Sequence, residues 1–75
     1  MRRSEFTALS EHVFGPVLAR TYTLELGLVP FGGRTAAVAL DDGEDVRRVW
    51  TALCDEMDVP ESRRWEIPPE ERRRR

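Results

Sequence analysis

The chain has 75 residues, of which 40% are hydrophobic and 35% charged, and its formal net charge at pH 7 is −2. This length allows one domain at most, and such a chain buries only about 60% of the surface that its unfolded form exposes. Residues 1–60 carry six Arg and ten acidic residues. A folded part built for nucleic acid is normally basic, so this balance argues against that class.

The cysteine count and the start of the sequence indicate the compartment. The one cysteine, Cys54, cannot form an intramolecular disulfide, so an oxidising compartment is not implied. The first residues lead into a charged amphipathic segment, and the sequence has no apolar stretch typical of a signal peptide or a membrane span. We therefore expect a cytoplasmic protein that is not associated with a membrane.

Apolar residues at helical spacing predict two helices in the first third of the chain. The first covers about residues 5–14, with the Ser4 hydroxyl as its N-cap. The pair Gly15-Pro16 interrupts the pattern, because proline disfavours helical geometry before it but fits a first turn. A second helix is expected over about residues 16–27. Its predicted inward residues are Val17, Leu18, Tyr22 and Leu26.

The rest of the chain is predicted to contain a loop and two or three further helical segments. Residues 29–33 read as a loop, and Thr35 is expected to cap a short helix over 36–42 that Gly43 ends. A last helical turn over residues 60–65 would place Trp65 on the core. The clearest helix lies between these segments, with apolar residues at i, i+3, i+4, i+7, i+8 and i+11. These residues are Val46, Val49, Trp50, Leu53, Cys54 and Met57.

Together these elements predict an all-α fold, a compact domain of three or four helices over residues 1–65. Residues 66–75 combine two prolines with a run of charges and are expected to form a flexible, disordered charged C-terminal tail. Trp50 is the predicted central residue, because it lies in the middle of the strongest apolar stripe. The other predicted core residues are Phe6, Leu9, Val13, Leu18, Tyr22, Val38, Val46, Val49, Leu53 and Met57.

Several short segments occur in the order and at the distances of one known family. They are Gly33-Arg34-Thr35, Ala39-Leu40, Val49-Trp50-Thr51-Ala52-Leu53-Cys54, Asp58-Val59-Pro60 and Arg64-Trp65. Over about residues 1–65 the chain resembles the actinobacterial domain of unknown function 3046 family of small helical proteins. Where the family usually has a Pro-Arg pair before the Val-Trp, this chain has Asp45-Val46-Arg47-Arg48. The resemblance implies a compact helical domain and supplies neither an activity nor functional residues.

The residues available for catalysis or metal binding are few. A catalytic histidine needs a nucleophile or carboxylate placed beside it, and a metal site needs three or four converging ligands. His12 is the one histidine, and Cys54 lies within the apolar stripe, where a cysteine acts as a small hydrophobe. The segment Gly32-Gly33-Arg34-Thr35 lacks the glycine spacing and lysine of a phosphate-binding loop and reads as a turn with an N-cap. We expect no enzyme, cofactor or metal.

One acidic cluster is a candidate docking site for a basic protein partner. It consists of Asp41, Asp42, Glu44 and Asp45. A calcium loop needs alternating oxygen ligands over twelve residues, and this window does not have that pattern. Glu44 and Asp45 also lie near the positive N-terminal end of the following helix, and Arg34 is available to pair with the cluster.

A helix-turn-helix over residues 35–57 is the alternative interpretation. Ala39, Gly43 and Val49 have the spacing common in that motif. The DNA-facing residues would be Arg47, Arg48 and Thr51. Against this, Asp42 stands where an apolar residue is usual, and an acidic turn would repel phosphates. The arginine run at residues 72–75 is a second candidate for nucleic acid. We therefore favour a non-enzymatic protein-interaction module with an unidentified protein partner over an accessory nucleic-acid-binding protein.

Overall fold

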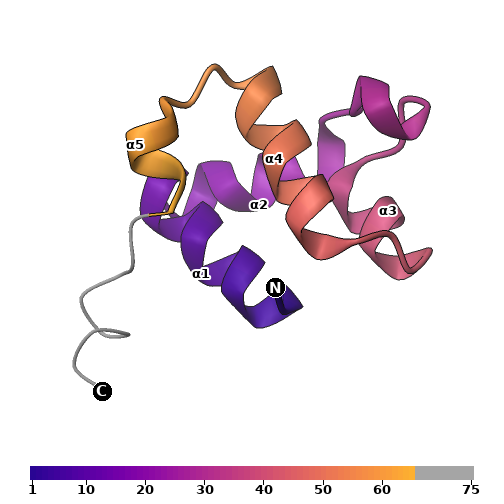
Figure 1. Cartoon of the computed structure of the whole chain (residues 1–75), viewed down its shortest axis with the longest axis horizontal. Helices are drawn as coiled ribbons and strands as arrows, with labels where there is room; N and C mark the ends of the chain where they lie inside the picture. Colours follow the sequence, from indigo (N-terminus) through magenta and orange to yellow (C-terminus); the bar gives the residue numbers. More distant parts are fainter. Residues whose placement is uncertain (66–75) are drawn as a thin grey trace.

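The structure is a computed structural model that describes residues 1–65, so the predicted tail over residues 66–75 lies outside the described residues. Its elements in chain order are α1 (Arg3–Phe14), α2 (Pro16–Glu25), the 3-10 helix η1 (Val29–Phe31), α3 (Ala36–Asp41), α4 (Val46–Glu56) and α5 (Glu61–Arg64) (Figure 1). The described part contains no strand beyond an isolated antiparallel bridge between Gly27 and Thr35. The predicted all-α fold is confirmed, and residues 1–65 contain five α-helices where three or four were expected.

The start of α1 lies two residues earlier than the predicted Ser4 cap would place it. Arg2 is the N-cap residue, and its backbone N–H donates to Oε1 of Glu5 over 2.9 Å. A glutamate three residues into a helix commonly accepts this bond, so the signal for the start was Glu5 and not the Ser4 hydroxyl. Gly15, with φ of +84°, ends α1, and Pro16 begins α2 as predicted.

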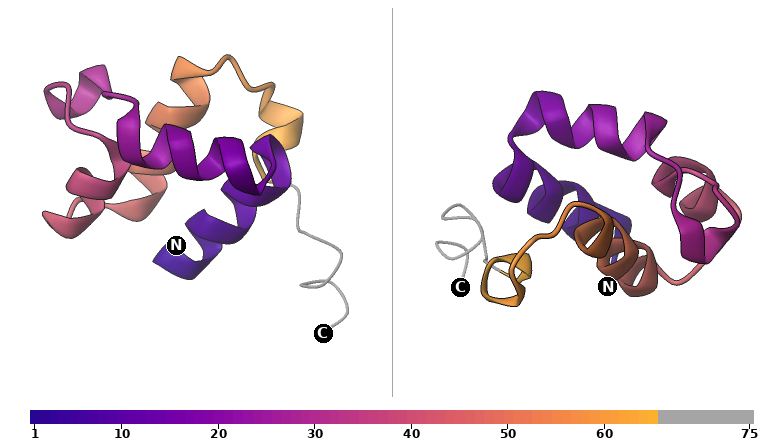
Figure 2. Two further views of the ribbon diagram at one scale, coloured as in Figure 1. Left: turned by 180° about the vertical axis from the view of Figure 1, so that it is seen from behind. Right: turned by 90° about the horizontal axis from the view of Figure 1, so that it is seen from above.

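The predicted inward face of α2 was wrong at its first two positions. Val17 is 78% exposed and Leu18 49% exposed, whereas Ala19 is buried. The inward face carries Ala19, Tyr22 and Leu26 at the i, i+3, i+7 spacing of one helical stripe, and Val17 and Leu18 lie off that stripe. α1 and α2 pack against each other across the turn at Gly15, where φ is positive (Figure 2). Tyr22 and Leu26 pack against the core as predicted.

The caps of α3 and α4 follow the sequence signals. The Thr35 hydroxyl accepts from the Val38 N–H over 3.3 Å, and the Asp45 carboxylate accepts from the Arg48 N–H over 3.2 Å. α4 packs against both α1 and α3 and is buried on most of its circumference. Its buried residues are Val49, Trp50, Ala52, Leu53 and Cys54.

Trp50 is the central residue, as predicted. Its side chain is fully buried, and its ring makes edge contacts with Phe6 at 5.6 Å and with Phe14 at 6.1 Å between centroids. Its indole Nε1 donates to the backbone oxygen of Arg64 over 3.0 Å. The Arg64 guanidinium in turn reaches Asp55 on α4 at 2.8 Å. Trp50 therefore joins α1, α4 and α5.

The predicted loop over residues 29–33 contributes core residues that the sequence did not reveal. Leu28 is fully buried and Phe31 is 4% exposed. The loop can be buried because its backbone is hydrogen-bonded: the Leu28 N–H donates to Arg34 O, and the Gly33 N–H donates to Leu28 O, both over 2.9 Å. Gly27 permits this close approach, since a Cβ at Gly27 would lie 2.6 Å from Gly33 O.

Two other predicted core positions are corrected by the structure. Val38, expected inside, is 46% exposed, because the buried side of α3 carries Ala36, Ala39 and Leu40. Trp65, expected on the core, is 37% exposed, and the Arg47 guanidinium lies over its ring at 4.9 Å from the centroid. The single turn of α5 ends before it can carry Trp65 inward.

Candidate functional site

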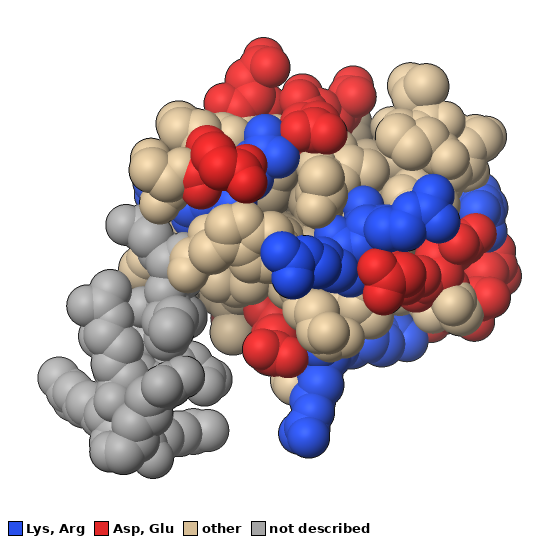
Figure 3. Space-filling model, viewed as in Figure 1, with Lys and Arg blue, Asp and Glu red and all other residues tan. Residues whose placement is uncertain are grey.

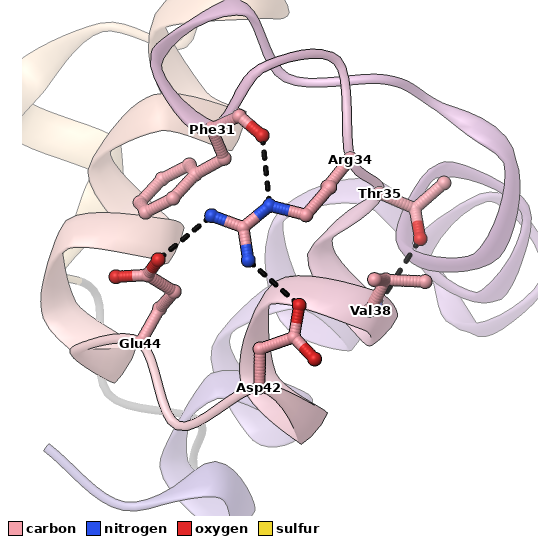
Figure 4. Close-up of polar contacts among 6 residues, drawn as sticks. All are labelled: Phe31, Arg34, Thr35, Val38, Asp42 and Glu44. Carbon is pink, nitrogen blue, oxygen red and sulfur yellow. Dashed lines mark hydrogen bonds and ion pairs between the residues drawn. The ribbon is translucent and has the colours of Figure 1, made fainter.

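The acidic cluster is organised around Arg34. The guanidinium donates from Nη1 to Asp42 and from Nη2 to Glu44, each over 2.7 Å, and from Nε to the Phe31 backbone oxygen over 2.9 Å (Figure 4). The hydrogen bonds that it donates to Glu44 and, to a smaller extent, to Asp42 raise the pKa of Arg34 above its ordinary value. The expected pairing of Arg34 with the cluster is confirmed, and it ties the η1 loop to the turn between α3 and α4.

The two outer members of the cluster also make contacts within the domain. Asp41 pairs with Arg3 of α1 at 2.9 Å, and Asp45 caps α4. The side chains stay open to solvent, 69% for Asp41 and 50% for Asp42. A basic partner would have to compete with Arg3 and Arg34 for these carboxylates. Docking at the cluster therefore stays a prediction, and each of its four residues has a structural role of its own.

The three predicted DNA-facing residues lie on the outer side of α4. Arg47 and Arg48 are exposed and Thr51 is half-buried. Both arginines stack on aromatic rings, Arg47 on Trp65 and Arg48 on Phe31, the latter at 5.5 Å. On the face shown in Figure 3, arginine and acidic side chains lie intermixed, without an extended region of one sign.

The three residues with helix-turn-helix spacing lie at the junction between α3 and α4. Ala39 and Val49 are fully buried where the helices cross, and Gly43 has φ of +86°. Trp50 and Cys54 of α4 are buried as well. A recognition helix that enters the major groove needs a broad free face. The free side of α4 carries the exposed acidic Asp55 and Glu56 beside its two arginines.

Neither the one cysteine nor the one histidine belongs to a metal site formed by the described residues. Within residues 1–65, no three His, Cys, Asp or Glu side chains are placed to hold a metal ion. Cys54 is fully buried, as predicted, and desolvation raises the pKa of its thiol to about 12. His12 is half-buried on α1. A thiol held in its neutral form is a poor nucleophile.

An open groove between α1 and α2 was missed by the sequence analysis. The buried side chains of Phe6 and Ala19 are among its lining, and Val17 and Leu24 line it while remaining 78% and 52% exposed. Its volume is about 690 Å³. The only available signal was the apolar content of residues 17–24, where the predicted helix face placed Val17 inside and did not include Leu24.

Comparison with known proteins shows the family to which the chain belongs. The family described as "Protein of unknown function (DUF3046)" matches residues 1–62. The chain belongs to the DUF3046 family. The match spans α1 to α4 and therefore includes the groove, the acidic cluster and the outer side of α4. The resemblance noted in the sequence is thus confirmed.

One relative of this DUF3046 protein is a larger protein of Mycobacterium tuberculosis. Its name is "Putative envelope-preserving system protein Rv2742c", and it is 51% identical over 35 residues. The match covers 47% of this chain and 13% of the relative. No solved structure matches the chain. Within residues 1–65, no helix has the length and apolar character needed to cross a membrane.

Proposed function

We propose that this protein is a non-enzymatic protein-interaction module of the cytoplasm, and that it docks a protein on the α1–α2 groove. The observation that carries the proposal is the outward placement of Val17 and Leu24 beside an open groove. A helix in a folded domain normally turns its large apolar side chains inward. Apolar side chains grouped on the outside commonly mark an interaction surface.

Three hydroxyl groups of the groove are already hydrogen-bonded within the domain. The hydroxyls of Ser10, Thr21 and Thr23 donate to backbone oxygens of their own helices over 2.7 to 3.1 Å. Covering a hydroxyl that is already hydrogen-bonded costs less free energy than covering one that depends on water. A partner helix could therefore lie in the groove without supplying polar groups for these residues.

Two further considerations support the proposal. Nucleophilic catalysis needs an activated nucleophile beside a base, and the one thiol of this sequence is buried and held neutral. The single cysteine is also consistent with a reducing compartment. The Mycobacterium tuberculosis relative is named as a system protein, which is consistent with a role of the shared 35 residues in an assembly.

The first test compares capture of proteins from the source cell by the wild type, Val17→Asp and Leu24→Asp. Each variant places a charge on the proposed docking surface and is expected to reduce recovery of the partner about tenfold or more. Val29→Asp is the matched control, because Val29 is equally exposed at 78% but lies on η1. Equal recovery by the Val17 and Val29 variants would show that the groove is not the docking site.

A second candidate function is nucleic-acid binding through α4, favoured by the buried Ala39 and Val49 and the left-handed Gly43. In this case Arg47→Ala and Arg48→Ala should each weaken duplex DNA binding by roughly 1–3 kcal/mol for a lost base contact. The measurement is a fluorescence anisotropy titration at several salt concentrations. An equal loss in the α2 control Arg20→Ala would indicate non-specific attraction to phosphates and contradict a role for α4.

A further inference from the structure

The exposed residues on the outer face of α2 are spaced so that they can pack against the same residues of a second copy of α2. Its positions follow the i, i+3, i+4, i+7 spacing of a helix–helix seam. They are Val17, Arg20, Thr21 and Leu24. If two such helices lie antiparallel and are centred between Arg20 and Thr21, Val17 of each faces Leu24 of the other. The exposed apolar side chains of one copy then cover those of the second.

The charged residues of the groove are also complementary to those of the same groove in a second copy. Glu11 of α1 and Arg20 of α2 both line it, and within residues 1–65 neither takes part in an ion pair. A partner with charge of one sign would leave either the acid or the arginine opposite a like charge. A second copy brings one of each sign, so its Arg20 can meet Glu11 and its Glu11 can meet Arg20.

We propose that a second copy of this chain occupies the α1–α2 groove, with the two α2 helices antiparallel across a twofold axis. This inference rests on the proposed function, since it names the partner of the same docking site. α2 has ten residues and is about 15 Å long. A standard interface buries about 800 Å² on each partner, and a helix this short covers less. The dimer is therefore weak and depends on protein concentration.

Sedimentation velocity on the full-length chain tests the dimer, over concentrations from about 1 µM to about 1 mM. The wild type is expected to shift from the 8.7 kDa monomer toward twice that mass as concentration rises. Val17→Asp should remain monomeric throughout, and Val29→Asp, with equal exposure on η1, should dimerise like the wild type. A wild type that stays monomeric at every concentration, or a dimer that Val17→Asp leaves intact, would overturn the proposal.

A charge exchange tests the arrangement within the dimer. Glu11→Arg and Arg20→Glu should each weaken dimerisation about tenfold, because each places like charges across the interface. The double variant restores opposite charges and should recover most of the wild-type dimerisation. Single variants that dimerise normally, or a double variant no better than either single one, would overturn the pairing of Glu11 with Arg20 and the antiparallel arrangement with it.

The experiments distinguish a failure of the proposed dimer from a failure of the proposed docking site. A wild type that is monomeric at all concentrations but captures another protein through Val17 rejects the second copy and leaves the groove as a docking site. A dimer that is lost in Val17→Asp, with no other protein captured from the cell, supports the second copy as the occupant.

Discussion

Replacing Trp50 by alanine is expected to lower the free energy of unfolding by about 3–5 kcal/mol, which is most of the stability of a domain this small. The indole is fully buried, contacts the rings of Phe6 and Phe14, and donates its N–H to Arg64 O. Its removal leaves a cavity between α1, α4 and α5 and an unpaired carbonyl. Chemical denaturation followed by circular dichroism measures the loss.

Trp65→Ala is the matched control, because it removes the same side chain from a position that is 37% exposed. The stack with Arg47 and only partial burial are lost there, so the expected destabilisation is clearly smaller than that of Trp50→Ala. Similar losses for the two variants would mean that the stripe on α4 does not form the centre of the core.

The central helix could be predicted from the sequence because its signal is local and uninterrupted. Trp50 and the apolar residues around it belong to one helix, so a single phase fixes which side they share. The face of α2 could not be predicted in this way. Its inward stripe begins with the small Ala19, so choosing the larger apolar residues Val17 and Leu18 selected the wrong face at the start of the helix. Phe31 was missed because its burial depends on hydrogen bonds between separate parts of the η1 loop.

In the candidate sites too, contacts between residues close in the sequence could be predicted, and contacts between distant residues could not. The acidic cluster was recognised from four neighbouring residues, and its partner Arg34 was found because it lies nearby in the chain. The contact of Asp41 with Arg3 spans 38 positions and left no trace in the sequence. The groove depends on how α1 and α2 cross, which is set by tertiary packing. A surface formed by two helices is therefore difficult to predict from the sequence, because it depends on how the helices pack.

Raising the pH above about 9 is expected to destabilise the fold through Cys54. Desolvation is the main cause that raises the pKa of this thiol from 9.0 to about 12, and nearby Arg64 opposes the shift only in part. Below the unfolded pKa both states hold the proton, so the contribution to stability is fully present. Between about pH 9 and 12 the unfolded thiol ionises while the folded one does not. Stability should fall by about 1.4 kcal/mol per pH unit, or about 4 kcal/mol over the interval.

Urea denaturation of the wild type and Cys54→Ala at a series of alkaline pH values measures this contribution. The substitution costs some stability at every pH, because it removes a buried sulfur from α4. All other residues are common to the two proteins, so the difference between their pH profiles reports the thiol alone. The wild type should lose stability more steeply with rising pH, and the two curves should converge toward pH 12. Curves that stay parallel from pH 8 to 12 would show that Cys54 ionises as readily in the folded protein as in the unfolded chain, contrary to its burial beneath α5.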